Sequence, residues 1–325
     1  MPDHAPTPAG DATAAAAPLT GPSVAPPRGR LPTTSSGTLT DAFGTPEWGL
    51  LAAIALIWGS SFVFMAEGLE ALRPAVITTA RLGLGALALS VLPRARRAVD
   101  REDLPRIAFL GVIWMAIPLL LFPIAQQSIS SSVAGMINGA MPIATAAWST
   151  ALLRQLPGRR QLVGIAVGFA GIVAIFLPEL GESAATARGA LLVGLAVVLY
   201  GLAANVAVPL QQRHGTLPVL WRAQLVALAV VAPFGVAQLD GSRWELGPVL
   251  AMVPLGVLGT GLAFAMMATL VGRVGGTRGS VAIYFVPVVA IVLGVALRGE
   301  RVAPLALLGT GLVLLGAWLT SRREG

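Results

Sequence analysis

Residues 139–155 read GAMPIATAAWSTALLRQ, and residues 284–300 read YFVPVVAIVLGVALRGE. These two stretches decide the fold, because Pro142 in the first matches Pro287 in the second at an offset of 145 residues. The same offset relates Ala151 to Ala296, Leu152 to Leu297, Gly164 to Gly309 and Gly171 to Gly316. Both copies are almost wholly apolar, so this weak internal repeat predicts a duplicated unit of hydrophobic helices.

The composition indicates a chain built for lipid. Of its 325 residues, 55% are hydrophobic and 11% are charged, whereas soluble domains have about 25% charged residues. The mean hydropathy is +0.79. The chain has no cysteine, which excludes disulfides and thiolate metal sites.

The basic residues are all arginine and give a net charge of +7. They lie in short clusters between apolar runs, which favours the anchoring of membrane loops over nucleic-acid binding. We therefore expect a lipid bilayer and a small molecule as partners, and no nucleic acid.

The two ends of the chain are predicted to lie in the cytoplasm. Residues 1–46 are rich in Pro, Ala, Thr and Gly and lack the periodicity of a core, so they are predicted to be a disordered tail. They lack the continuous apolar run of a signal peptide. Residues 321–325 are predicted to be a short C-terminal extension.

Ten apolar stretches are candidate membrane spans, since about 20 apolar residues cross the hydrocarbon core. They are 48–68, 74–92, 107–126, 132–152, 161–178, 189–209, 218–238, 249–271, 279–297 and 304–320. With the N-terminus inside, fifteen arginines fall on inner segments and five on outer loops. This bias predicts a multi-pass inner (plasma) membrane protein with both termini cytoplasmic.

The spans divide into two predicted units, 47–178 and 187–320, with five spans each. Because five is odd, the second unit must enter the membrane upside down relative to the first. Inverted repeats of this kind are typical of secondary transporters that work by alternating access. We therefore expect an all-α membrane protein of ten helices in two inverted repeats.

Several motifs resemble EamA-type members of the drug/metabolite transporter superfamily. They are IWGSSFVFMAEGL (57–69), PAVITTARLGLGALAL (74–89) with its Arg81, and the stretch 256–316 with its proline and the GER ending at Glu300. One departure is Gln155, which stands where the family commonly has the first-repeat glutamate. The resemblance covers about residues 48–320 and implies movement of small organic solutes, often the export of amino acids or other metabolites.

Two charged residues lie within predicted spans of the first unit. Arg81 is near the middle of its span, where a charge costs about 2.5–3.5 kcal/mol on insertion scales. It is either a ligand for a substrate carboxylate or a gate, or a structural arginine bonded to helix-end carbonyls or snorkelling inward. Glu67 is expected at the outer interface; the alternative is a protonatable coupling site. No acidic residue lies convincingly at a midplane, so the sequence does not indicate proton coupling.

The matching prolines are predicted hinges. Pro142 and Pro287 each remove a backbone hydrogen bond and clash with the carbonyl four residues back, at Asn138 and Ile283. Freed carbonyls at mid-depth are tolerated beside protein or a water-filled cavity. We therefore expect Asn138 and Tyr284 to border a central cavity; the alternative is a kink that only improves packing.

Aromatic and small polar residues complete the candidate binding site. Trp58 and Ser61 lie near the centre of the first span, Tyr200 and Asn205 near the centre of the sixth, and Trp114 in the third. Aromatic walls with a few polar groups suit an amphipathic organic solute.

Other functions are less compatible with the sequence. An intramembrane enzyme needs a nucleophile with a base or a membrane acid pair, but His214 is expected in a loop and no such pair lies in the spans. A non-transporting scaffold or receptor would need long loops or soluble domains. We expect no cofactor and no metal, and a monomer suffices because one chain carries both units.

Overall fold

The computed structural model describes residues 44–153, 158–274 and 281–321, and no β-strand occurs among them. The tail up to residue 43, Gln155 and residues 322–325 lie outside the described residues. Helices suit an apolar setting because they satisfy every backbone N–H and C=O within one segment. The all-α prediction is confirmed for the part of the chain that the structure describes.

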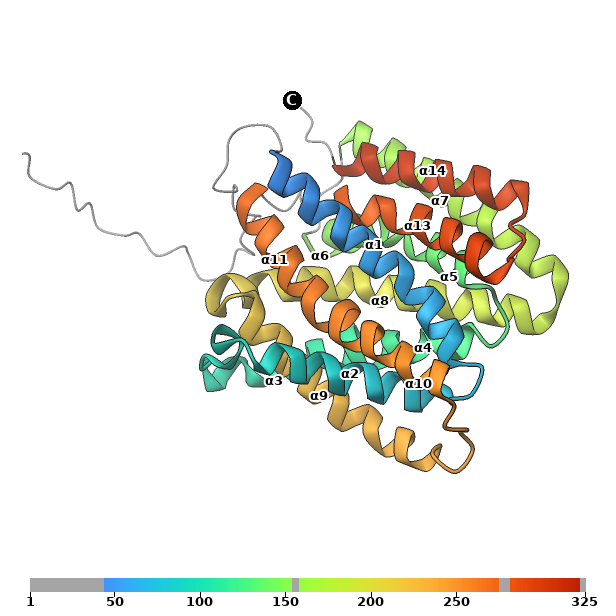
Figure 1. The fold of residues 1–325 in the computed structure, drawn as a ribbon. Helices are drawn as coiled ribbons and strands as arrows, with labels where there is room; N and C mark the ends of the chain where they lie inside the picture. Colours follow the sequence, from blue (N-terminus) through green and yellow to red (C-terminus); the bar gives the residue numbers. More distant parts are fainter. Residues whose placement is uncertain (1–43, 154–157, 275–280, 322–325) are drawn as a thin grey trace, which may run out of the picture. The chain divides into compact units, whose positions relative to one another are not determined.

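The first half consists of helices joined by short connections (Figure 1). They are α1 (Thr45–Gly68), α2 (Pro74–Ser90), α3 (Leu104–Leu110), α4 (Ile117–Ala125), α5 (Ser131–Asn138), α6 (Met141–Leu153) and α7 (Arg159–Glu182). A π-helical segment, η3 (Gly111–Ala116), joins α3 to α4, and two short 3-10 segments, η1 (Pro93–Arg96) and η2 (Arg101–Asp103), precede α3. The first helix begins at Thr45, slightly inside the predicted tail.

The second half repeats several of these features. Its helices are α8 (Ala184–His214), α9 (Thr216–Ala237), α10 (Leu246–Val253), α11 (Ala263–Val274), α13 (Val281–Arg298) and α14 (Pro304–Ser321). A second π-helical segment, η4 (Pro254–Leu262), joins α10 to α11. Since π-helical turns are rare and frequently occur at functional sites, their presence in both halves draws attention to these two stretches.

Seven stretches of described helix are long and apolar enough to cross a membrane. They are Thr45–Gly68, Arg101–Ala125, Leu162–Glu182, Ala184–His214, Thr216–Ala237, Leu246–Val271 and Val281–Arg298. Pro74–Ser90 and Pro304–Leu319 are shorter apolar helices. Large apolar side chains such as Leu87, Phe169 and Leu297 are exposed, as expected for a surface that faces lipid.

The predicted span 132–152 is not one continuous helix. α5 ends at Asn138 and α6 begins at Met141, with Pro142 in the first turn of α6. The amide of Ala140 donates to the Ile137 carbonyl at 3.0 Å, which closes a turn between the two helices. Pro142 fits this break because it lies in the first turn of α6, where a backbone N–H has no partner within the helix.

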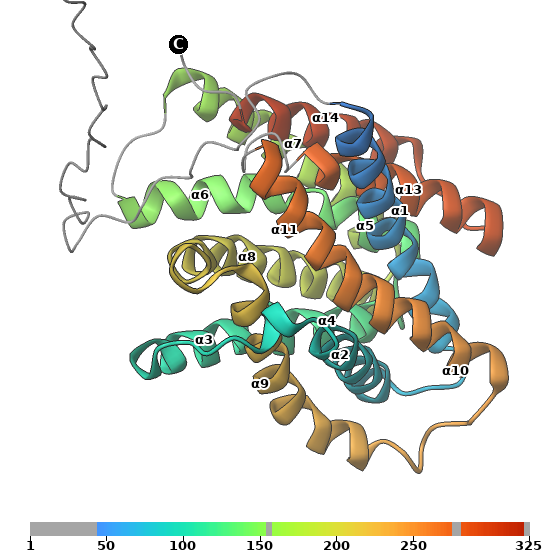
Figure 2. The ribbon, with the colours of Figure 1, turned by 60° about the vertical axis from the view of Figure 1, so that its left-hand side comes forward.

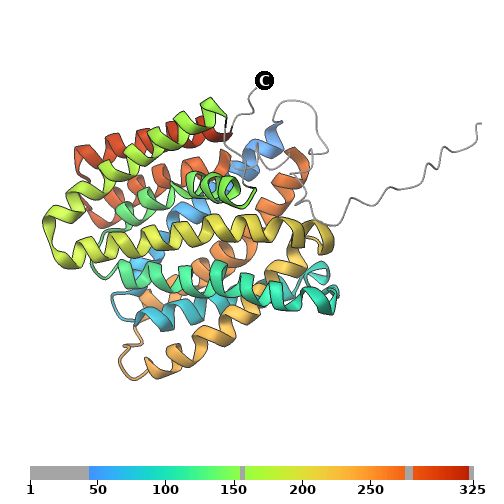
Figure 3. The same cartoon turned by 180° about the vertical axis from the view of Figure 1, so that it is seen from behind.

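Helices from the two halves pack against each other throughout. α1 lies beside α13, α2 beside α9 and α7 beside α14 (Figure 1), while α8 runs between α6 and α4 when seen from behind (Figure 3). Figure 2 shows the stretch from α10 to α11, which runs beside α1. The middle part of this stretch, η4, also packs against α2. The residues of one half therefore complete the surroundings of the other.

Glycines bring α7 and α14 into backbone contact. A Cβ added at Gly171 would lie 2.6 Å from the Gly309 carbonyl oxygen, and one at Gly316 would lie 2.5 Å from that of Gly164. Small residues allow such close approach of membrane helices, so these glycines serve packing.

Candidate functional site

A cavity of about 310 Å³ lies between the two halves of the chain. Its described lining comes from α1, α2, η3, α4, α5 and α6 of the first half, and from α8, α9, η4, α11 and α13 of the second half. Most of these side chains are apolar or aromatic. A small-molecule site has this size and character.

Six of the eight residues predicted to bind a solute line this cavity. They are Trp58, Ser61, Arg81, Trp114, Asn138 and Tyr200. Asn205 and Tyr284 are not part of the lining, and neither are the predicted hinges Pro142 and Pro287, although their neighbours Met141 and Val286 are. The structure therefore brings together residues from five separate predicted spans.

Tyr284 and Asn205, which we predicted as binding residues, make hydrogen bonds to neighbouring helices instead of lining the cavity. The Tyr284 hydroxyl donates to the Ala317 carbonyl of α14 at 2.9 Å. The Asn205 amide donates to the carbonyls of Thr145 in α6, at 3.1 Å, and Gly201, at 2.9 Å. Both side chains therefore make contacts that hold helices together.

Arg81 is 6% exposed and is fixed from one side by η4. Its Nε donates to the Thr260 hydroxyl at 3.1 Å, and that hydroxyl donates to the Leu255 carbonyl at 3.1 Å. The amide of Gln224 donates to the Thr260 carbonyl at 2.6 Å. Arg81, in the first half of the chain, thus bonds to a buried hydroxyl group of the second half. Among the described residues it makes no hydrogen bond to a helix-end carbonyl, which was the structural alternative named above.

One wall of the cavity is built around Phe264, which sequence reasoning missed. Trp58 and Trp114 both meet its ring edge to face, with ring centroids 5.2 Å and 5.4 Å apart. The Trp58 indole N–H donates to the Gly259 carbonyl at 3.0 Å. With its polar N–H already bonded, Trp58 offers an apolar ring surface to a solute.

A second aromatic row begins at Phe62, one turn after Trp58 on the same face of α1. Phe62 and Phe122 meet edge to face at 5.6 Å, and Phe122 stacks on Tyr200 at 6.0 Å.

Phe122 was not predicted as a site residue. Phe62 also lines the cavity without having been predicted. The offset of 145 relates Phe62 to Ala207, Phe122 to Met267 and Phe264 to Leu119. None of these counterparts was a predicted site residue, so the repeat carried no signal for the three phenylalanines.

The cavity extends toward one end of the helices. Gln211 near the end of α8, Thr216 at the start of α9 and Val271 near the end of α11 are part of its lining. At the same end, Arg273 of α11 pairs with Glu47 of α1 at 3.1 Å.

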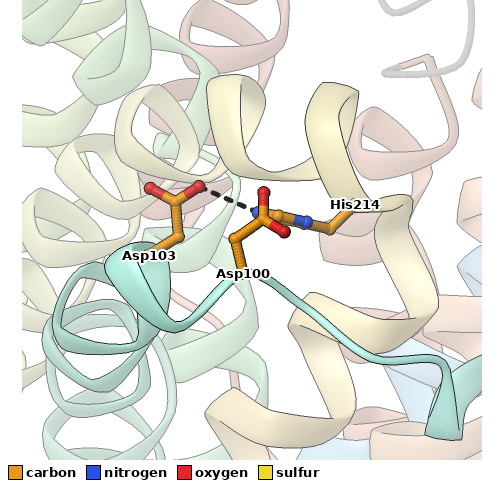
Figure 4. Close-up of side chains that lie close together, drawn as sticks. All are labelled: Asp100, Asp103 and His214. Carbon is orange, nitrogen blue, oxygen red and sulfur yellow. Dashed lines mark hydrogen bonds and ion pairs between the residues drawn. The ribbon is translucent and has the colours of Figure 1, made fainter.

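An ion-pair network around the buried side chains of Asp103 and His214 joins η2 to α8 at this end (Figure 4). The side chain of Asp103 is 3% exposed and accepts from His214 at 2.8 Å, Arg213 at 2.9 Å and Arg106 at 3.1 Å. His214 is the last residue of α8 and not part of a loop. Asp100, Asp103 and His214 offer ligand atoms within 4.8 Å of one another, but two arginines already neutralise Asp103, so these contacts suit a structural cluster.

The opposite end is joined by contacts between the two halves. Arg298 at the end of α13 pairs with Glu67 at 3.4 Å and Glu70 at 3.0 Å. Arg243, in the loop after α9, donates to the Glu70 carbonyl at 2.8 Å. A separate pocket of about 410 Å³ lies here, and Glu67 and Arg298 line it together with apolar residues of α1 and α10.

Glu300 forms a second link at this end, between the loop after α13 and the start of α5. Its carboxylate accepts from the amides of Ser131 and Ser132, both at 2.9 Å, and from their hydroxyls at 2.6 Å and 2.5 Å. Gly299 has a φ of +63°, a conformation that favours glycine and turns the chain so that Glu300 reaches α5.

Known proteins of similar sequence are transporters by name. An uncharacterized transporter of Archaeoglobus fulgidus is 24% identical over 278 residues, covering 86% of this chain and 99% of that protein. A probable terminal-alkyne amino-acid exporter of Streptantibioticus cattleyicolor is 27% identical over 281 residues, covering 85% and 93%. One solved crystal structure, 18% identical with a TM-score of 0.60, covers 85% of this chain and 97% of its own and supports the fold alone.

The EamA-like transporter family matches the chain twice, over residues 47–177 and 187–322, which together make up well over half of it. The family consists of transporters, and its match agrees with the apolar helices described above. This chain is therefore a multi-pass membrane protein that belongs to the EamA-like transporter family.

Proposed function

We propose that this chain exports small organic metabolites, among them amino acids or related solutes, across the inner (plasma) membrane by alternating access. The observation that carries the proposal is the central cavity. Both halves of the chain line it, and its lining extends to one end of the helices, at Gln211 and Thr216. Glu67, Glu70 and Arg298, which form ion pairs between the halves at the other end, are not part of the described lining.

The cavity lining itself supports two inverted five-span repeats. Six pairs of lining residues are related by the offset of 145: Phe62 and Ala207, Trp114 and Gly259, Leu119 and Phe264, Phe122 and Met267, Asn138 and Ile283, and Met141 and Val286. A pseudo-two-fold axis through the cavity would relate the members of each pair. Binding sites at the interface of inverted repeats are typical of such transporters.

Helix packing supports the same symmetry. The contact of α1 with α13 has its counterpart in that of α8 with α6, and the contact of α2 with η4 in that of α9 with η3. α2 with α9 and α7 with α14 are pairs of equivalent helices. Counting α5 and α6 as one interrupted span gives ten spans, so a single chain contains a complete pathway and can act as a monomer.

The arginine bias assigns the two ends. It favours a cytoplasmic location for the end that contains the N-terminus of α1 and the C-terminus of α8. The cavity extends toward Gln211 and Thr216 at that end, so the described conformation corresponds to an inward-facing state. Release to the outside then requires Arg298 to separate from Glu67 and Glu70.

Cross-linking in proteoliposomes tests this mechanism. The chain has no cysteine, so Glu67→Cys with Arg298→Cys can be joined by a short cleavable thiol reagent. Flux is followed for a panel of amino acids, their N-acyl derivatives, carboxylates and organic cations. We expect the bridge to stop flux and its cleavage to restore flux, because the closed end can then open again.

A matched control uses Ser183→Cys with Thr186→Cys, whose wild-type hydroxyls lie 2.8 Å apart at the start of α8 and do not join the two halves across the gate. The same reagent there should leave flux unchanged. Continued flux through the bridged Glu67→Cys and Arg298→Cys protein would contradict alternating access at this gate, and no flux of any solute in the panel would contradict transport itself.

A further inference from the structure

The cavity has one formal charge among its described lining residues, the guanidinium of Arg81. No carboxylate is part of this lining, and none of the ion pairs found within the described residues involves Arg81. Arg81 is nevertheless more than nine-tenths buried. A cation at membrane depth is costly unless an anion compensates it, and an intramembrane charge marks a functional position by default.

The geometry of Arg81 leaves donors available. Arginine has five N–H donors in a planar fork, and the hydrogen bond to Thr260 uses only the one on Nε. Within the described residues, no hydrogen bond is made by its terminal nitrogens. A guanidinium that is fixed at Nε is preorganised to bind a carboxylate through two parallel hydrogen bonds.

The walls around Arg81 suit an apolar body. The rings of Trp58, Trp114 and Phe264 form one face, and those of Phe122 and Tyr200 form another. Because the Trp58 N–H is bonded to the Gly259 carbonyl, this face presents ring surface and few polar groups.

A free ammonium group finds no matching partner here. The other side chains of the described lining that carry a polar atom are neutral: Trp58, Ser61, Trp114, Asn138, Tyr200, Gln211 and Thr216. The Ser61 hydroxyl already donates to the Ile57 carbonyl at 2.8 Å. An ammonium taken out of water would therefore lack an anion, and Arg81 would repel it.

We propose that the solute of this cavity is an organic monoanion, a carboxylate on an aromatic or branched apolar body that has no free ammonium group. Arg81 binds the carboxylate, and the aromatic walls hold the body. N-acylated and deaminated derivatives of apolar amino acids have this chemistry, whereas the amino acids themselves do not. The inference rests on the proposed function and defines its substrate class.

Four related probes test the proposal on the unaltered protein. They are N-acetyl-phenylalanine, 3-phenylpropanoate, phenylalanine and phenethylamine, and calorimetry measures their binding to the full chain in detergent. We expect the first two to bind at least roughly 10-fold more tightly than phenylalanine, with phenethylamine weakest, since only they combine a carboxylate with no ammonium. Equal or tighter binding of phenylalanine or phenethylamine would overturn the proposal.

Variants of the arginine locate the effect. Arg81→Gln should weaken binding of both carboxylates roughly 10- to 100-fold by removing a charged, bidentate partner. It should leave the affinity for the neutral N-acetyl-phenylalanine amide unchanged. Arg81→Lys should restore part of the loss, because it keeps the charge but not the fork. Arg188→Gln is the control, since Arg188 is exposed and outside the lining.

A folded Arg81→Gln protein with undiminished carboxylate affinity would overturn the proposal. If that variant fails to fold, the four probes on the unaltered protein still decide. Flux in proteoliposomes separates this inference from the proposed function. Movement of phenylalanine or phenethylamine without the carboxylates would preserve transport and exclude the proposed class, whereas selective carboxylate binding with no flux of any probe would exclude transport alone.

Discussion

The two helices that carry the matching prolines differ in one decisive way. α13 continues through Pro287 for its full length, whereas the equivalent stretch in the first half breaks into α5 and α6 before Pro142. The residues before the prolines differ accordingly. Gly139 and Ala140 precede Met141 and Pro142 and form a turn, while apolar side chains occupy the corresponding stretch of α13.

The position of α5 depends on contacts with the other half of the chain more than that of the continuous helix α13 does. α5 has only eight residues, and helices this short are marginal without tertiary contacts. Its first amides bond to Glu300, and its Gly135 lies directly against Ala290 of α13. In the second half the proline therefore lies in one continuous helix, α13. In the first half the matching span is interrupted, and its short part α5 is held in place by contacts with residues of the second half.

The largest expected effect comes from removing the carboxylate that holds α5. Glu300→Gln keeps the size of the side chain but loses its charge and part of its four hydrogen bonds with Ser131 and Ser132. We expect a loss of about 3 kcal/mol in the free energy of unfolding, since hydrogen bonds to charged groups contribute about 1.5–3 kcal/mol and helix caps about 1 kcal/mol. Thermal unfolding in detergent measures it.

The control for this prediction is Glu102→Gln, because Glu102 is exposed at the other end of the helices. It should change stability by less than about 0.5 kcal/mol. If the two variants are equally stable, Glu300 does not hold α5, and the contrast between the two proline helices has another cause.

Titration gives an independent measurement of the same contact. Burial raises the pKa of Glu300, but the four hydrogen bonds from Ser131 and Ser132 outweigh it and hold the pKa below its ordinary value of 4.5. A group with a lowered pKa stabilises the fold fully above its unfolded value and loses that stabilisation as the pH falls through the folded one. The gap in melting temperature between the unaltered protein and Glu300→Gln should therefore narrow on acidification, and a constant gap would contradict the contact.

Much of this architecture could be predicted from sequence, because apolar length and the offset of 145 depend only on residue order. The break before Pro142 could not, since an identical proline leaves α13 intact. Helix rotation explains why Tyr284 lies outside the described lining. One residue turns a helix by about 100°, so Ile283 and Val286 line the cavity while Tyr284 contacts α14.

Helix rotation also explains why Asn205 lies outside the lining, whereas Phe264 was overlooked for a different reason. Ala204 and Val208 line the cavity, but Asn205 between them bonds to α6. Phe264 was overlooked because a lone phenylalanine in an apolar span carries no signal of its own. The repeat offset did not indicate it either, because its counterpart Leu119 was not a predicted site residue.

A smaller effect is expected where α5 touches α13. In Gly135→Ala the added Cβ would overlap with that of Ala290, which is itself fully buried. Forcing an extra carbon into a packed contact costs about 2 kcal/mol. Gly311→Ala is the matched control because nothing lies near its added Cβ, and denaturant or thermal unfolding compares the two. Equal stability of both variants would show that α5 can move away from α13 without cost.

The smallest effects should distinguish the prolines themselves. Pro142 lies in the first turn of α6, where a backbone N–H has no partner within the helix, so Pro142→Ala should change stability by less than about 0.5 kcal/mol. Pro287 lies inside α13, so Pro287→Ala restores a donor for the Ile283 carbonyl and should stabilise the protein by about 1 kcal/mol. Unfolding of the two variants side by side measures the difference. A larger effect at Pro142 than at Pro287 would mean that Pro142, and not the turn at Gly139 and Ala140, maintains the break.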